Sequence, residues 1–184
     1  MFVDISYHKG TDRIIIYVIS SGKMSQQCLQ ILGLCFAVTV AWCCPYGWIK
    51  HGPACYHLGP EEESWFDGMK MCQIHGSVLA SVENQEEHNF IVSLMRNTHK
   101  SIVWLGGSDW NVEGSFVWEP YGDQITYTNF SPGEPNDYKN SEDCLLIDGS
   151  SHKNNTYTWD DRNCHDSYFY VCKQMDDITG NLIG

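Results

Sequence analysis

Nine cysteines in a chain of 184 residues are the feature that most limits what this sequence can fold into. Cytosolic proteins rarely hold so many cysteines unless they bind metal, and the closely spaced CxxC pairs of zinc ribbons are absent from the sequence. Disulfide bonds formed in an oxidising compartment are therefore the better interpretation. The length is typical of one compact domain.

The charge of the chain argues against one class of partner. There are 23 acidic and 11 basic residues, and the formal net charge is -12. Nucleic acids and anionic membranes attract clustered Lys and Arg, which an excess of negative charge does not provide. We therefore expect no nucleic-acid binding. Hydrophobic residues make up 42% of the chain and aromatic residues 13%, which indicates a folded core rather than a disordered acidic tail.

Residues 1–43 are predicted to be a leader that is absent from the mature protein. The run LQILGLCFAVTV at residues 29–40 has the length of a signal-peptide core and is shorter than the roughly 20 residues of a spanning helix. Cleavage after Ala41 or after Cys43 satisfies the small-residue rule, and Met24 is an alternative start. The competing interpretation is a buried core helix. We expect a secreted protein without a membrane anchor, in which Cys43, if retained, can link a homo-oligomer.

The remaining chain is predicted to form one domain at residues 44–174, followed by a short tail at 175–184. Residues 44–184 have a net charge of -13 and contain six cysteines, namely Cys44, Cys55, Cys72, Cys144, Cys164 and Cys172. An even number in a secreted domain indicates three disulfide bonds, and spacing alone leaves fifteen ways to pair them.

The pattern of the domain is that of an α+β fold. Two helices are predicted at 64–74 and 84–95, with Glu86 and Glu87 placed to favour the dipole of the second. Short strands are predicted at 102–105, 115–118, 144–148, 157–159 and 168–172, after an extended segment at 48–58. The long segment 119–143 has little regular pattern and many oxygen ligands, and such loops are commonly functional.

Acidic residues gather around this loop and around two of the cysteines. Glu134, Asn136 and Asp137 lie in it, Glu142 and Asp143 precede Cys144, and Asp160 and Asp161 come shortly before Cys164. A bond between Cys144 and Cys164 would bring these groups together, and only Lys139, Lys153 and Arg162 are nearby in sequence. Ca²⁺ is the natural compensating ion, because it takes carboxylate, amide and carbonyl oxygens. The alternative is a solvated acidic loop.

Several motifs in order resemble the C-type lectin-like domain. They are Cys44-Pro-Tyr-Gly-Trp48, Trp104-Leu105-Gly106-Gly107, Glu134-Pro135-Asn136, Glu142-Asp143-Cys144, Trp159-Asp160-Asp161, and the closing Cys164 and Cys172. The resemblance covers about residues 44 to 174. It implies a domain with two helices, small antiparallel sheets and a long Ca²⁺-binding loop. It also implies the long form of the domain, with the bonds Cys44–Cys55, Cys72–Cys172 and Cys144–Cys164.

The resemblance further implies two calcium sites and a sugar-binding function. The principal ion would be held by Glu134, Asn136, Glu142, Asp160 and Asp161, and an auxiliary ion by Asp109, Glu113, Asp137 and Asp143. Glu134, Asn136, Glu142 and Asp160 would also contact sugar, and the bond before Pro135 would be cis. The Glu-Pro-Asn motif implies glycans with equatorial 3- and 4-hydroxyls, of the mannose, N-acetylglucosamine or fucose type.

One residue departs from the family pattern, in which Trp-Asn-Asp is usual where this chain has Trp159-Asp160-Asp161. An ionised Asp160 accepts hydrogen bonds but does not donate the amide hydrogen that Asn provides. We therefore expect calcium to bind while the affinity or selectivity for sugar differs from the family norm.

The leading hypothesis is a calcium-dependent lectin for microbial or self glycans, without catalytic residues. A second hypothesis is an acidic, calcium-binding structural protein that adsorbs to mineral or matrix. A glycosidase is the weakest of the three, because the paired carboxylates are better explained as metal ligands.

Overall fold

A computed structural model describes residues 5–6, 17–18 and 44–175. The chain divides into two units, residues 1–47 and 48–184. In the first, β1 (Ile5–Ser6) pairs antiparallel with β2 (Tyr17–Val18). The apolar run of the predicted leader, Met24, both cleavage positions, Cys43 and nearly all of the C-terminal tail lie outside the described residues. Within the described residues, no helix is long and apolar enough to span a membrane.

The second unit contains two α-helices and a mixed sheet, which confirms the predicted α+β class. Its elements are β3 (Ile49–His51), β4 (Ala54–Leu58), α1 (Trp65–Ile74), β5 (Val78–Leu79), α2 (Gln85–Asn97), β6 (Ile102–Ser108), β7 (Val117–Trp118), β8 (Asp123–Gln124), β9 (Cys144–Asp148), the 3-10 turn η2 (Ser151–Lys153), β10 (Thr158–Arg162) and β11 (Phe169–Met175). Every predicted strand overlaps an observed one. The two-residue strands β5 and β8 were not predicted, because so short a strand has no periodicity.

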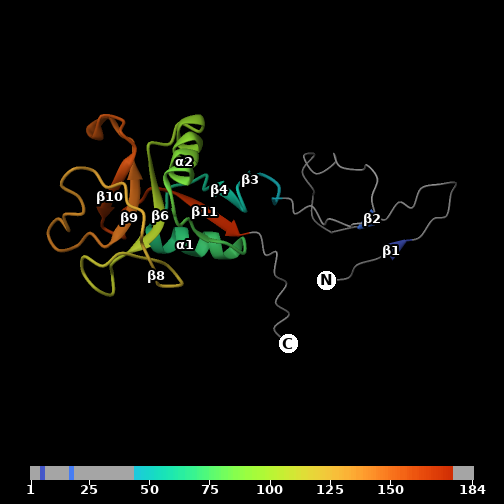
Figure 1. Cartoon of the computed structure of the whole chain (residues 1–184), viewed down its shortest axis with the longest axis horizontal. Coiled ribbons are helices and arrows are strands. Elements are labelled where there is room, and N and C mark those ends of the chain that lie inside the picture. Colours follow the sequence, from blue (N-terminus) through green and yellow to red (C-terminus); the bar gives the residue numbers. More distant parts are fainter. Residues whose placement is uncertain (1–4, 7–16, 19–43, 176–184) are drawn as a thin grey trace. The chain divides into compact units, whose positions relative to one another are not determined.

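The last strand lies in the interior of the sheet. The strand order is β10-β9-β6-β11-β4-β3, with β5 on β11 and the pair β7-β8 on β6. β11 runs parallel to β6 and antiparallel to β4. Both helices lie near β4 and β11, and the loops that join β8 to β9 and β9 to β10 extend from the other side of the unit (Figure 1). The acidic loops therefore extend from the side of the sheet where β9 and β10 lie.

Both helices begin where the sequence predicts, because a polar side chain caps each one. Ser64 Oγ accepts the backbone N–H of Asp67 at 3.2 Å, and Asn84 Oδ1 accepts that of Glu87 at 2.9 Å. Such caps satisfy N–H groups that have no partner within the helix. Glu87 does more than favour the helix dipole: it is buried, and its carboxylate lies 2.5 Å from the ammonium of Lys173 on β11.

Three tryptophans form the centre of the core. Trp65, Trp104 and Trp159 are all buried. Trp159 packs with Ile91 and other apolar residues of α2, β6 and β9, while Trp65 and Trp104 belong to a second cluster that includes the disulfides. The packing of Trp159 anchors β10 to the core, and Asp160 and Asp161 follow Trp159 on that strand.

The cysteine framework agrees with the implied pairing. Cys72 of α1 is bonded to Cys172 of β11, and Cys144 of β9 is bonded to Cys164, two residues after β10. Cys44 and Cys55 are also disulfide-bonded. The Cys144–Cys164 bond holds β9, which follows Asp143, close to β10, which contains Asp160 and Asp161.

A buried histidine should make the fold sensitive to acid. The indole N–H of Trp159 donates to Nδ1 of His88 at 3.2 Å, and burial lowers the pKa of His88 against an opposing hydrogen bond with the Tyr157 backbone. The unfolded chain therefore takes up a proton at a higher pH than the folded chain. The contribution of His88 to stability should be full above about pH 6.5 and fall below it, by up to about 1.4 kcal/mol per pH unit.

Urea unfolding of the wild type and His88→Gln between pH 5 and pH 8 measures this effect. The free energy of unfolding of the variant should decline less than that of the wild type below about pH 6.5, because Gln does not titrate. Parallel pH profiles for the two proteins would contradict the assignment to His88.

Candidate metal centre

The loop from 119 to 143 is held in place by a buried carboxylate on β10. Asp161 accepts the backbone N–H of Asn136 at 3.1 Å and that of Asp137 at 2.7 Å. The Glu134-Pro135 bond is cis, which confirms that expectation, and the Glu119-Pro120 bond, which was not predicted, is cis as well. Asp161 thus fixes the backbone of the Glu134-Pro135-Asn136 motif through hydrogen bonds to ionised oxygens.

Three carboxylates meet at this point. Glu134, Asp160 and Asp161 each offer an oxygen, and these oxygens lie within 4.8 Å of one another. Asp160 and Asp161 are buried on β10, Glu134 is half-buried, and the amide of Asn136 donates to Glu134. Carboxylate and amide oxygens from these residues are the donor set that Ca²⁺ prefers. We call this group, with Asn136 and Glu142, the principal site.

Glu142 lies at the edge of the principal site. Its Oε2 accepts the N–H of Tyr138 at 3.1 Å, and its Oε1 lies 3.6 Å from the guanidinium of Arg162. Burial raises the pKa of Glu142. Glu142 is not one of the three residues whose oxygens lie within 4.8 Å of each other, so the structure does not bring it together with all of them.

Two basic side chains also enter the principal site. The ammonium of Lys153 lies 2.7 Å from Glu134 Oε1 and 3.0 Å from Asp160 Oδ2. Arg162 lies 2.6 Å from the same Asp160 oxygen and donates to the Asp161 carbonyl at 2.8 Å. These two cations face the carboxylates of Glu134, Glu142, Asp160 and Asp161, so they offset only part of the negative charge, as the small number of nearby basic residues predicts. Two of the three basic residues considered lie in the site, because the β9-β10 loop and β10 place them there.

Lys153 and Glu134, which contact each other, shift each other's pKa. Burial acts to raise the pKa of Glu134, but hydrogen bonds from Lys153 and Asn136 outweigh it, and the pKa is lowered. Burial likewise acts to lower the pKa of Lys153, but its bonds to Glu134 and Asp160 raise it. Burial raises the pKa of Asp160 despite both cations. At neutral pH the contact between Glu134 and Lys153 is a contact between ions.

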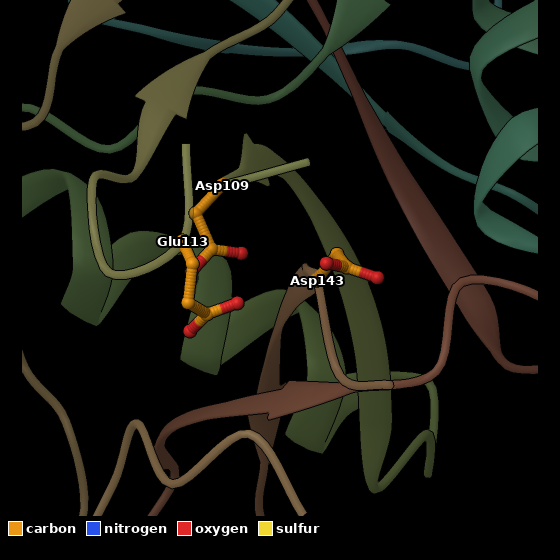
Figure 2. A group of neighbouring side chains, drawn as sticks. All are labelled: Asp109, Glu113 and Asp143. Atoms are coloured by element: carbon orange, nitrogen blue, oxygen red, sulfur yellow. The ribbon is translucent and has the colours of Figure 1, made fainter. Parts of the chain in front are cut away.

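A second acidic group lies beside the first. Asp109 follows β6, Glu113 lies in the next turn, Asp143 precedes β9, and one oxygen of each lies within 4.8 Å of the others. Figure 2 shows the carboxyls of Asp109 and Glu113 together, with Asp143 projecting from a separate segment toward the same space. Asp137, the fourth residue of the proposed auxiliary set, is not in this group. Its Oδ1 accepts the N–H of Glu142 at 3.1 Å.

Asp109 has a buried oxygen that a cation bound to this auxiliary group would satisfy. Its Oδ2 accepts the N–H of Gly114 at 2.9 Å, whereas its Oδ1 is buried without a hydrogen-bond partner. Burial raises the pKa of Asp109 to about 6, and the charges of Glu113 and Asp143 add to this effect. A buried oxygen without a partner is costly, and a bound cation would satisfy it.

Comparison with known proteins decides the family. A model of the lectin C-type domain matches residues 61–174. The chain belongs to the C-type lectin domain family. Members of this family are generally non-enzymatic binding proteins, carbohydrate-binding lectins among them, and their domains generally bind Ca²⁺.

Two relatives and one solved structure show how far the likeness extends. A perlucin-like protein of Mytilus galloprovincialis is 33% identical over 132 residues, which cover 70% of this chain and 81% of that protein. The low affinity immunoglobulin epsilon Fc receptor of Mus musculus is 34% identical over 134 residues, covering 72% of this chain and 37% of the receptor. The cow carbohydrate-recognition domain of CD23, solved in the presence of a GlcNAc2Man3 oligosaccharide, superposes with a TM-score of 0.63 at 28% identity, covering 72% of this chain and 95% of that one.

Proposed function

We propose that this C-type lectin domain belongs to a secreted protein that binds glycans through a calcium ion at the principal site. The observation that most supports this is the meeting of Glu134, from the long loop whose Glu134-Pro135 bond is cis, with Asp160 and Asp161 of β10. A bound calcium ion would supply the positive centre that two neighbouring sugar hydroxyls coordinate. The auxiliary group of Asp109, Glu113 and Asp143 is proposed to hold a second ion.

The side chains around Pro135 are suited to recognise those hydroxyls. Asn136 is exposed, so it can meet a ligand that arrives from solvent, whereas the side chain of Glu134 is 9% exposed and contacts the Lys153 ammonium, which would have to move. A carboxylate accepts a hydrogen bond from a hydroxyl, and an amide donates one to its oxygen. Glu134 and Asn136 together provide both functions for one hydroxyl. Glu142 would serve the second hydroxyl as acceptor.

Asp160 is the residue where we expect this lectin to differ from its relatives. Its carboxylate is buried between Lys153 and Arg162 and has no amide hydrogen to donate. The proposed sugar class is that of glycans with equatorial 3- and 4-hydroxyls, such as mannose, N-acetylglucosamine or fucose. The GlcNAc2Man3 oligosaccharide present with the cow domain supports this class.

Binding to mannose-agarose with calcium and with chelator tests the proposal. Wild-type protein should be retained with calcium and released by chelator, and Glu134→Gln should lose retention because it removes an ionised ligand of the principal site. Glu86→Gln is the matched control, since Glu86 is exposed in the first turn of α2, and it should behave as wild type. Retention that chelator does not affect would contradict the proposal.

A further inference from the structure

The position of Lys153 is set by the short turn between β9 and β10. The N–H of Lys153 donates to Ser150 at 3.1 Å, its carbonyl accepts the Thr156 hydroxyl at 2.8 Å, and Asn154 takes a left-handed conformation that closes η2. Ser150 is itself fixed by Asp148 at the end of β9. These bonds direct the Lys153 side chain toward the principal site, where it is only 23% exposed.

The Lys153 ammonium bridges two residues of the principal site. It contacts Glu134 from the long loop and Asp160 from β10, at 2.7 Å and 3.0 Å. Calcium binds carboxylate oxygens at 2.3 to 2.6 Å, so an ion on these two oxygens would occupy almost the same place as the ammonium. Two cations this close repel each other strongly where water is partly excluded. Lys153 and an ion therefore cannot share this pair of oxygens.

Arg162 has a different relation to the same residues. Its guanidinium contacts both oxygens of Asp160, at 2.8 Å and 2.6 Å, and also donates to the Asp161 carbonyl. Arg162 and Asp160 belong to the same strand, β10, so this two-point contact forms within one strand. It neutralises the negative charge that Asp160 has and that the usual Asn would not have. Lys153 reaches the site from a loop through a flexible side chain, so it is the cation that can withdraw.

We propose that Lys153 is a built-in counter-cation of the principal site, which bridges Glu134 and Asp160 when calcium is absent and withdraws before an ion binds. The inference rests on the proposed function only in taking Glu134 and Asp160 as calcium ligands. It implies that the wild type binds calcium more weakly than a variant without the ammonium. It also implies that calcium stabilises the wild type less, because Lys153 already offsets part of the negative charge of the apo site.

Calorimetric calcium titration of the full chain tests this proposal. Lys153→Gln should bind calcium about tenfold more tightly at the principal site, which is identified as the site lost in Glu134→Gln. Lys153→Arg keeps a cation and should stay near wild type. Lys139→Gln is the matched control, since it removes one charge from the same acidic region, where Lys139 lies over the ring of Tyr138, and it should change the affinity less than about twofold.

Thermal unfolding gives an independent measure. In chelator Lys153→Gln should melt below wild type, and with saturating calcium the two should melt together. Equal calcium affinities for wild type, Lys153→Gln and Lys139→Gln would overturn the proposal and leave the lectin function standing. Calcium binding by Lys153→Gln but not by wild type would support it while refuting calcium-dependent function of the natural chain. Absence of binding in both would overturn it as well.

Discussion

Replacing Lys173 with methionine is expected to lower the free energy of unfolding by about 3 to 5 kcal/mol, because it leaves a buried carboxylate without its cation. Lys173 is 7% exposed and Glu87 is 6% exposed, and the two charged groups lie 2.5 Å apart. The pair connects α2 to β11, the central strand next to β4. Its loss therefore affects the middle of the unit rather than its surface.

The neighbours of this pair satisfy its remaining hydrogen bonds but cannot replace its charge. The carboxylate of Glu87 accepts the Tyr56 hydroxyl and, at 2.8 Å, the N–H of Glu83. Burial and the hydrogen bond to Glu87 raise the pKa of Tyr56, so its hydroxyl stays neutral. Lys173 donates to the Ser81 hydroxyl at 3.0 Å, and that hydroxyl also loses its partner in the variant.

An exposed ion pair on α1 provides the control. Lys70 lies 3.0 Å from Asp67, with side chains 70% and 53% exposed, and Lys70→Met should cost less than about 1 kcal/mol. The double variant Glu87→Leu with Lys173→Met should recover much of the loss, because it leaves no unpaired charge. Urea unfolding at pH 7 measures all three. A Lys173→Met effect no larger than that of Lys70→Met would contradict the argument.

Removing Cys72–Cys172 and removing Cys144–Cys164 are expected to affect stability and metal binding to different extents. The bond Cys72–Cys172 spans 100 residues and Cys144–Cys164 spans 20. The loss of loop-closure entropy predicts destabilisation of about 4.7 kcal/mol for the first and about 3 kcal/mol for the second when both cysteines become alanine. The longer loop should therefore matter more for unfolding.

Calcium affinity should fall more when Cys144–Cys164 is removed than when Cys72–Cys172 is removed. Cys144 follows Asp143 directly, and Cys164 comes shortly after Asp160 and Asp161, so this bond fixes the relative positions of proposed ligands on separate segments. Cys72–Cys172 joins α1 to β11, and neither cysteine is adjacent in sequence to a residue of either acidic group. Urea unfolding and calcium titration of both double variants measure the two effects. A larger loss of calcium affinity in the Cys72/Cys172 variant would contradict this division.

Local signals were sufficient to predict most of the fold. Ser64 and Asn84 act as caps because the chemistry of a helix start is contained in a few consecutive residues. The strand that contains Asp160 was recognised from apolar and aromatic residues, although it extends three residues beyond the predicted end. The Glu134-Pro135-Asn136 motif gave the location of the principal site through its family resemblance.

Contacts between distant segments could not be predicted in the same way. No motif marks Lys153, and its approach to Glu134 depends on how the β9-β10 loop turns. Glu87 follows a cap and has the pattern of a solvated first-turn carboxylate, yet tertiary packing places Lys173 against it. Lys153 and Arg162 stand out in the sequence as basic residues near the acidic motifs, but the sequence does not indicate which carboxylates they contact.

The central position of β11 determines when this unit can fold during synthesis. β4 and β6 are made early, but each pairs along one edge with a strand that begins at Phe169. Until that strand leaves the ribosome, the edges of β4 and β6 lack this partner, and Glu87 lacks its cation. Assembly must therefore wait for nearly all of residues 48–175, and pairings so distant in sequence are expected to form slowly. The unit should depend on folding assistance more than a helical bundle of the same length.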